Sequence, residues 1–196
     1  MKENIGYFYK EDLSLNMGLN DIAQLNRRLL FADREFVENL SSCVQPIAAG
    51  IVMTKTGKIL TVNKTKKSTG GVSPERDKTL LYVGGHISME DEGQNTLETL
   101  IFGMKREINE ELNIEIEDNQ IKKPFLVYTP TSLKSSKHMG VLFPVVIEKE
   151  CDLKFTDGKC MFIPFEKVRE IENLEDWSSI VYKEIEKDKV KSNRTK

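Results

Sequence analysis

The sequence predicts one α/β domain, because strand-like apolar runs alternate with segments of helical periodicity. An apolar, β-branched run over 47–54 is followed by the turn 55–57 and a second run over 58–63, which together predict a β-hairpin. Over 96–112 the apolar residues recur at steps of three and four, which predicts an amphipathic helix. A chain of 196 residues is long enough to bury a core of ordinary size within one domain.

The first 43 residues predict a helical extension that packs on this domain. Asp21 can cap a segment with apolar residues at helical spacing, and Asp33 can cap a second short helix. The apolar residues of this segment, expected to be buried, are Ile22, Leu25, Leu29, Leu30 and Phe31. We therefore expect a helical extension over 1–43, the α/β domain over 44–190 and a basic tail over 191–196.

The other elements follow in a regular order. A polar stretch over 64–79 predicts an exposed loop, and a short buried strand over 80–83 runs into the glycine pair Gly84-Gly85. Further strands are expected over 125–129, 140–147 and 160–163, and helices after Pro164 and around Trp177. We expect Trp177 in the core or in an interface rather than as a platform for a nucleobase.

Composition excludes several classes of protein. The 29 basic and 31 acidic residues give a net charge of −2, which argues against broad nucleic-acid binding. No apolar run approaches the roughly 18 residues of a membrane helix, and the charged N-terminus does not resemble a signal peptide. The three cysteines (Cys43, Cys151 and Cys160) form no CxxC pair, which disfavours zinc and disulfide frameworks. We expect a reduced, soluble, cytoplasmic protein that does not bind membranes.

Three carboxylates crowd one stripe of the helix over 96–112. At about 100° per residue, Glu110 lies near −60° and Glu111 near +40° from Glu107. Like charges four residues apart destabilise a helix, so the stripe is unfavourable unless a cation lies among the oxygens. Mg²⁺ and Mn²⁺ prefer such ligands, hold phosphate oxygens and activate water. The alternative is a solvated charged face, although a chance arrangement explains the whole string poorly.

The string that carries these residues resembles a known family motif. This part of the chain resembles the Nudix box G-x5-E-x7-R-E-U-x-E-E-x-G-U. The matching residues are Gly84-Gly85, then Glu98, then Arg106-Glu107-Ile108 after seven residues, then Glu110-Glu111 after one residue, and Ile114. The resemblance covers about 30 residues, and the flanking elements are compatible with the Nudix α/β/α sandwich with a mixed sheet. The chain also looks like a little-studied bacterial branch with a Gly-Gly-His start and a lengthened loop.

The resemblance implies a role for each matched residue. Glu107, Glu110 and Glu111 match the carboxylates that bind the metal, and one of them would orient or deprotonate the attacking water. Arg106 and Glu98 match a pair that positions the catalytic helix through a salt bridge. Gly85 matches the glycine whose carbonyl often completes the metal shell, so the implied metal set is Glu107, Glu110, Glu111 and Gly85.

Two departures from the motif concern the loop and the end of the helix. Twelve residues separate Gly85 from Glu98 instead of five, which predicts an insertion that contains Asp91. Asn113 replaces the second glycine; this is a mild change, because asparagine also tolerates the left-handed conformation past a helix. Two histidines, His86 and His138, and three lysines could approach the metal or phosphates, or they could be structural. These lysines are Lys64, Lys66 and Lys67.

The function implied is that of a pyrophosphohydrolase dependent on Mg²⁺ or Mn²⁺, acting on a nucleoside diphosphate linked to another group. Water would attack phosphorus while the metal ion stabilises the leaving phosphate. The first alternative is a catalytically weak ligand-binding or regulatory module. The second, an isopentenyl-diphosphate-isomerase-like enzyme, would need a cysteine near the box, where the sequence has none. The expected partner is a nucleotide-type small molecule, and the N-terminal apolar stripe could support a homodimer.

Overall fold

The computed structural model describes residues 3–64, 75, 77–133, 135–151, 153, 155 and 158–194. Among these residues, one mixed sheet carries the fold and a helix lies on each of its sides. The strands are β1 (Asn4–Tyr9), β2 (Gly18–Asn20), β3 (Leu30–Asp33), β4 (Cys43–Thr54), β5 (Lys58–Lys64), β6 (Val83–His86), β7 (Phe125–Tyr128), β8 (His138–Ile147) and β9 (Gly158–Pro164). The helices are α1 (Arg34–Asn39), α3 (Thr96–Leu112) and α4 (Asp176–Arg194).

The long strand β4 organises the sheet. It runs parallel to β8 from Gln45↔His138 to Thr54↔Ile147, and β7 and β2 continue the sheet beyond β8. On its other side β4 pairs in turn with β1, β6 and β5, each antiparallel. β5 leaves β4 after one pair and runs antiparallel to β9 for seven residues. β6 has only four residues, and among the described strands it pairs with β4 alone.

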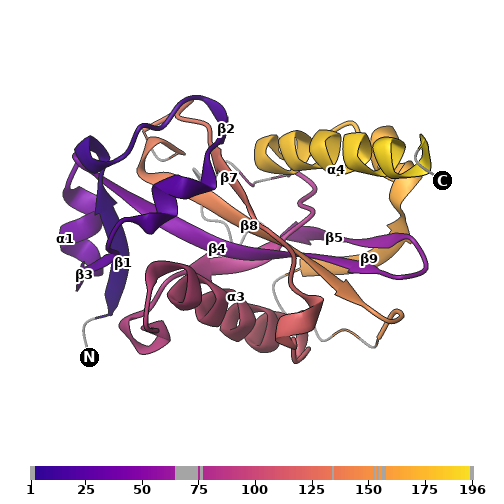
Figure 1. Ribbon diagram of the computed structural model, residues 1–196, viewed down its shortest axis with the longest axis horizontal. Helices are drawn as coiled ribbons and strands as arrows, with labels where there is room; N and C mark the ends of the chain where they lie inside the picture. The colour runs from indigo at the N-terminus through magenta and orange to yellow at the C-terminus, as the bar shows by residue number, and fades with distance from the viewer. Residues whose placement is uncertain are drawn as a thin grey trace.

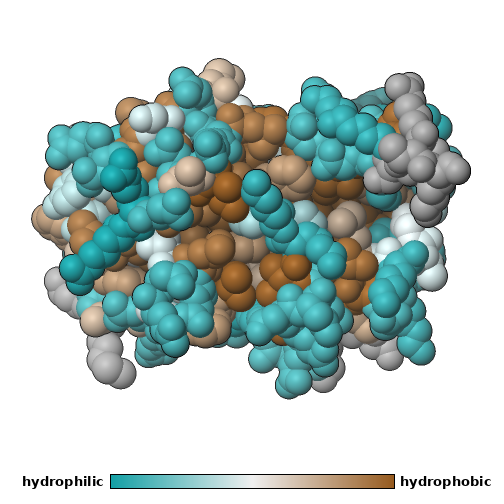
Figure 2. Space-filling view, in the orientation of Figure 1, coloured by the Kyte–Doolittle hydropathy of each residue, from teal (hydrophilic) through white to brown (hydrophobic). Residues whose placement is uncertain are grey.

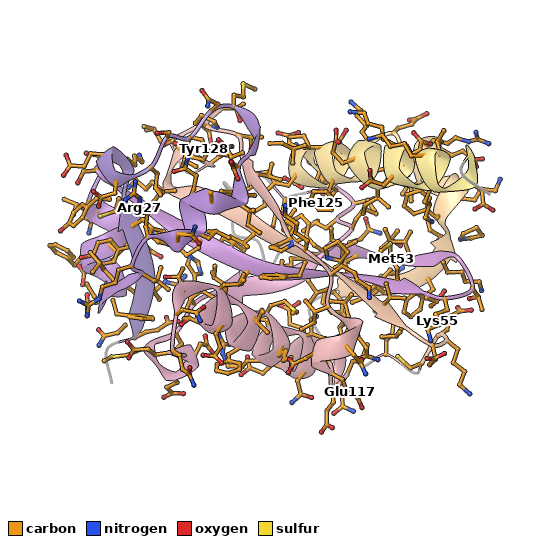
Figure 3. All side chains as sticks on the ribbon, in the orientation of Figure 1. Arg27, Met53, Lys55, Glu117, Phe125 and Tyr128 are labelled. Atoms are coloured by element: carbon orange, nitrogen blue, oxygen red, sulfur yellow. The ribbon has the colours of Figure 1, made fainter. Side chains whose placement is uncertain are left out.

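The helices α3 and α4 cover opposite sides of the sheet (Figure 1). The core between α3 and the strands contains Leu100, Met104, Ile108 and Leu112, all fully buried. Hydrophilic residues cover the outer side of α4, and apolar residues gather in the band between the two helices (Figure 2). Phe125 and Tyr128 mark the two ends of β7 (Figure 3). The expected helix over 96–112 and the strands near 47–54, 125–129, 140–147 and 160–163 are therefore confirmed.

The helical character predicted for the first 43 residues is wrong. This segment consists mainly of β1, β2 and β3, with the 3-10 turn Ile22–Asn26 and the short helix α1. β1 pairs with β3 and with β4, so the segment extends the central sheet instead of covering it as a helix. Asp21 and Asp33 do cap the turn and α1 through their side chains. The apolar spacing seen in the sequence arises because Leu25 and Leu29 reach the core from a turn and a strand entry.

Three other boundaries differ from the expectation. The strand expected over 80–83 is shifted to β6, and Leu80 makes only an isolated bridge to Val62. The segment after Pro164 is a 3-10 helix, Phe165–Glu170, rather than an α-helix. α4 continues to Arg194, into the expected tail, because its last turns contain neither glycine nor proline. Lys66 and Lys67 lie outside the described residues. No helix in the described part of the chain has the length and apolar character needed to cross a membrane.

Candidate active site

The helix α3 begins and ends with side chains that satisfy its terminal groups. The Asn95 side chain accepts a hydrogen bond from the Glu98 backbone N–H at 3.0 Å. At the other end Asn113 has φ 57° and ψ 42°, which is the left-handed conformation expected where the Nudix box has glycine. The substitution of asparagine for glycine therefore leaves the end of the helix in the expected geometry.

Two glycines allow α3 to approach its neighbours closely. A Cβ added to Gly50 on β4 would lie 2.3 Å from Ile108 Cδ1, and one added to Gly103 would lie 2.4 Å from Ile87 Cδ1. Both distances are shorter than real Cβ contacts, so a larger residue at either position would force the end of the isoleucine side chain to move. The close approach places the polar side of α3 beside β6 and the loop that follows it.

Arg106 pairs with Asp91, and the predicted pair between Arg106 and Glu98 is wrong. Arg106 Nε donates to Asp91 Oδ1 at 2.9 Å and Nη2 donates to Asp91 Oδ2 at 3.0 Å, a bidentate geometry. Asp91 is 5% exposed and also accepts from the Ser88 N–H at 2.8 Å. The Glu98 carboxylate instead accepts from the Gln94 N–H at 2.5 Å. Asp91 takes the position because five residues separate it from Gly85, so the insertion follows it.

The guanidinium of Arg106 also reaches the carboxylate stripe. Nη1 donates to Glu107 Oε1 at 2.9 Å and to Glu110 Oε2 at 3.1 Å, and Nη2 donates to the His86 carbonyl at 3.0 Å. The hydrogen bonds that Arg106 donates to Asp91 are the largest cause of the raised pKa of Arg106. The cation therefore offsets part of the repulsion that the sequence predicted among the carboxylates.

Gly85 lies directly against Glu107. A Cβ at Gly85 would lie 2.5 Å from Glu107 Oε1, so a larger residue at this position would displace the carboxylate from where it lies. Burial raises the pKa of Glu107, and the Arg106 charge and hydrogen bond oppose that shift. The Glu107 side chain is 16% exposed, whereas that of Glu110 is 58% exposed. The carboxylates of one stripe therefore stand in different environments.

The residues around Gly85 fit a hard cation in their chemistry. Glu107, Glu110 and Glu111 supply only oxygen donors and line one cavity together with Gly85. Among the described residues, no three acidic, histidine or cysteine side chains are already gathered closely enough to hold a metal ion. Because Arg106 contacts one oxygen each of Glu107 and Glu110, an ion would share these carboxylates with the guanidinium.

The cavity continues from the carboxylates past β6 to the N-terminal end of α4. Its volume is about 650 Å³. The sequence indicates His86, His138 and Lys64 as candidates for contact with the metal or phosphates, and all three line this cavity. Tyr82 and Glu175, which line the α4 end, were not predicted from the sequence. No local motif marks these two residues, because a strand entry and a helix start 93 positions apart bring them together.

Solved structures with the same architecture are Nudix proteins. The protein Tm1382, a putative Nudix hydrolase, superposes with a TM-score of 0.73 at 22% identity, over 93% of this chain and 98% of its own. The MutT protein of Methanosarcina mazei Go1 gives a TM-score of 0.54 at 16% identity, over 74% of this chain and 96% of its own.

A third similar structure contains ligands. It is a bifunctional NMN adenylyltransferase/ADP ribose pyrophosphatase from Francisella tularensis, complexed with AMP and a manganese ion. The match has a TM-score of 0.54 at 16% identity and covers 74% of this chain and 42% of that protein. No protein-family model and no curated protein sequence matches the chain. At these identities the similarity establishes the Nudix fold, and the predicted mixed-sheet α/β architecture is confirmed.

Proposed function

We propose that this protein is a Nudix pyrophosphohydrolase that requires Mg²⁺ or Mn²⁺. One observation carries the proposal: Glu107, Glu110 and Glu111 line a cavity from a helix that the ion pair between the buried Asp91 and the partly buried Arg106 holds beside Gly85. A solvated charged face would need neither the Asp91–Arg106 ion pair nor a glycine beside Glu107. The manganese and AMP in the structurally similar Francisella tularensis protein support the same class of ligand for this cavity.

The metal would be held by the three glutamates, with the Gly85 carbonyl as a further candidate ligand. When bound, it would supply charge stabilisation for the leaving phosphate and an acidified water. Arg106 holds Glu107 and Glu110 at fixed positions along the helix. We propose a nucleoside diphosphate linked to a second group as the substrate.

A hydrolysis screen tests this function. The protein is incubated with nucleoside diphosphate derivatives in Mn²⁺, in Mg²⁺ and in EDTA, and the phosphate-containing products are measured. We expect turnover only with metal. The variant Glu111→Gln should lose it, whereas Glu115→Gln, which removes an exposed charge just past the helix, should keep it. Metal-independent turnover, or equal turnover in both variants, would contradict the proposal.

A further inference from the structure

Two histidines from different strands meet in the cavity. The rings of His86 and His138 lie edge to face, with their centroids 5.4 Å apart. His86 ends β6 and pairs with Ile47, and His138 begins β8 and pairs with Gln45. Since paired residues and residues two apart along a strand share one face, both rings and the Gln45 side chain lie on the same side of the sheet.

That side of the sheet is the side covered by α4. Gly140 follows His138 on the same face, and a Cβ at Gly140 would lie 2.6 Å from the Trp177 ring of α4. Gly85, one residue before His86, faces the opposite way and contacts Glu107 on α3. A ligand that crosses the short strand β6 therefore passes from the carboxylates directly to the two imidazoles. Arg106 fixes this distance, because it binds both the carboxylates and the His86 carbonyl.

Both imidazoles line the cavity, whereas Gln45 is 1% exposed and does not line it. The groups on this side of β6 that can meet a ligand are therefore the two rings. A hydroxyl group can donate to an imidazole nitrogen and can also accept from an imidazole N–H. A phosphate oxygen can only accept.

Beyond the histidines the cavity wall is acidic. Glu175 is 5% exposed, lines the cavity and accepts from the Ser178 N–H at 3.0 Å. In the part of the chain that the structure describes, Glu175 has no cationic partner, whereas Glu75 and Asp176 have Lys64 and Lys78 at 3.5 and 3.1 Å. A buried carboxylate without a cationic partner repels a further phosphate and attracts hydroxyl donors.

We infer that His86 and His138, with Glu175 beyond them, form a subsite for an uncharged, hydroxyl-bearing group attached to the diphosphate. The inference rests on the proposed function, because it places the diphosphate at Glu107. It narrows the substrate to a nucleoside diphosphate joined to a sugar or a similar polyol, and it disfavours nucleoside triphosphates. His138 and Glu175 are then residues that determine specificity.

Ligand binding tests the subsite without relying on turnover. Trp177, the single tryptophan, lines the cavity and reports binding by fluorescence. ADP-ribose is compared with ATP, and UDP-glucose with UTP, each in calcium, which also binds oxygen ligands. We expect the parent to bind the sugar derivative of at least one pair about tenfold more tightly, which corresponds to about 1.4 kcal/mol.

The variants separate the two parts of the subsite. His138→Phe keeps a ring but removes its hydrogen bonds, so it should abolish the preference by weakening only the sugar derivative. Glu175→Gln should reduce the preference by strengthening the triphosphate, while Glu172→Gln, at an exposed site on the same segment, should change neither ligand. A preference for triphosphates in the parent, or equal losses for both ligands in His138→Phe, would overturn the inference. If the preference holds but no diphosphate is hydrolysed, the subsite stands and the proposed function fails.

Discussion

The two ends of the cavity differ in how the chain builds them. At the α3 end, Arg106, Glu107, Glu110 and Glu111 lie within six residues of one helix, and helical periodicity alone brings them to one stripe. At the α4 end, the corresponding groups come from β6, β8 and the residue just before α4. The first end depends on local geometry and the second on strand register. The proposed chemistry of the site can therefore be predicted from sequence, whereas the meeting of His86, His138 and Glu175 appears only in the fold.

The α3 end also depends on the N-terminal segment, and removal of that segment should have the largest effect. The Gly6 N–H donates to the Ile87 carbonyl at 2.8 Å, which ties β1 to the chain between β6 and Asp91. Ile5, Phe8, Leu25, Leu29 and Val37 are all buried. Each such side chain contributes roughly 1.5–3 kcal/mol. Deletion of residues 1–40 should give insoluble or unfolded protein, measured by circular dichroism and thermal melting; an unchanged melting curve would contradict this.

Replacement of Asp91 should reveal which acidic residue supports Arg106. Asp91→Asn leaves the guanidinium without its buried anion and should lower the free energy of unfolding by about 3 kcal/mol. Arg106→Ala should cost a similar amount, together with activity. Glu98→Gln keeps an acceptor for the Gln94 N–H and should cost less than about 1 kcal/mol. Urea denaturation of the three variants measures these differences. A larger loss in the free energy of unfolding for Glu98→Gln than for Asp91→Asn would support the Arg106–Glu98 pair that the motif implies.

Neutralising one carboxylate of the stripe should affect turnover more than stability. Glu111→Gln keeps the shape of the side chain but removes an anionic oxygen from the proposed metal site. We expect a fall in turnover of about 100-fold, which is roughly 2.7 kcal/mol of transition-state stabilisation. The metal-free fold should be as stable as the parent or more stable, because the neighbouring carboxylates repel one another. Steady-state kinetics and melting without metal, with Glu115→Gln as the control, measure both effects.

The smallest expected effect concerns the pH dependence of stability at the α4 end. Burial raises the pKa of Glu175, so the folded state disfavours its ionised form. For a raised acidic pKa, the stabilising contribution is complete below the unfolded pKa and is lost as pH rises through the folded pKa. Glu175→Gln has no group that ionises at this position. Its melting temperature should therefore exceed that of the parent by a margin that grows as pH rises from acidic to neutral. The melting temperatures of the two proteins, measured without metal across that range, should diverge. Parallel curves would show that burial does not raise the pKa of Glu175.

The sequence predicted the elements whose residues interact locally and missed those set by distant contacts. Both ends of α3 followed from periodicity, and the left-handed Asn113 followed from its match to the second glycine of the Nudix box. The pairing of Asp91 with Arg106 was missed because Glu98 has the motif's spacing from Arg106, whereas Asp91 has the motif's spacing from Gly85. The N-terminal segment was predicted to be helical because Leu25 and Leu29 have a helical spacing, although they reach the core from a 3-10 turn and from the residue before β3. Glu175 had no local pattern to identify it.

Calorimetric titration with manganese tests the metal-site claim most directly. It compares the parent with Glu107→Gln, Glu110→Gln and Glu111→Gln, because each change removes one anionic oxygen donor from a hard cation. We expect one manganese site in the parent and weaker binding in every variant. The loss should be smallest for Glu110→Gln, because this side chain is the most exposed of those that Arg106 binds. Equal manganese affinity in all four proteins would contradict the metal site on α3, and with it the proposed hydrolase.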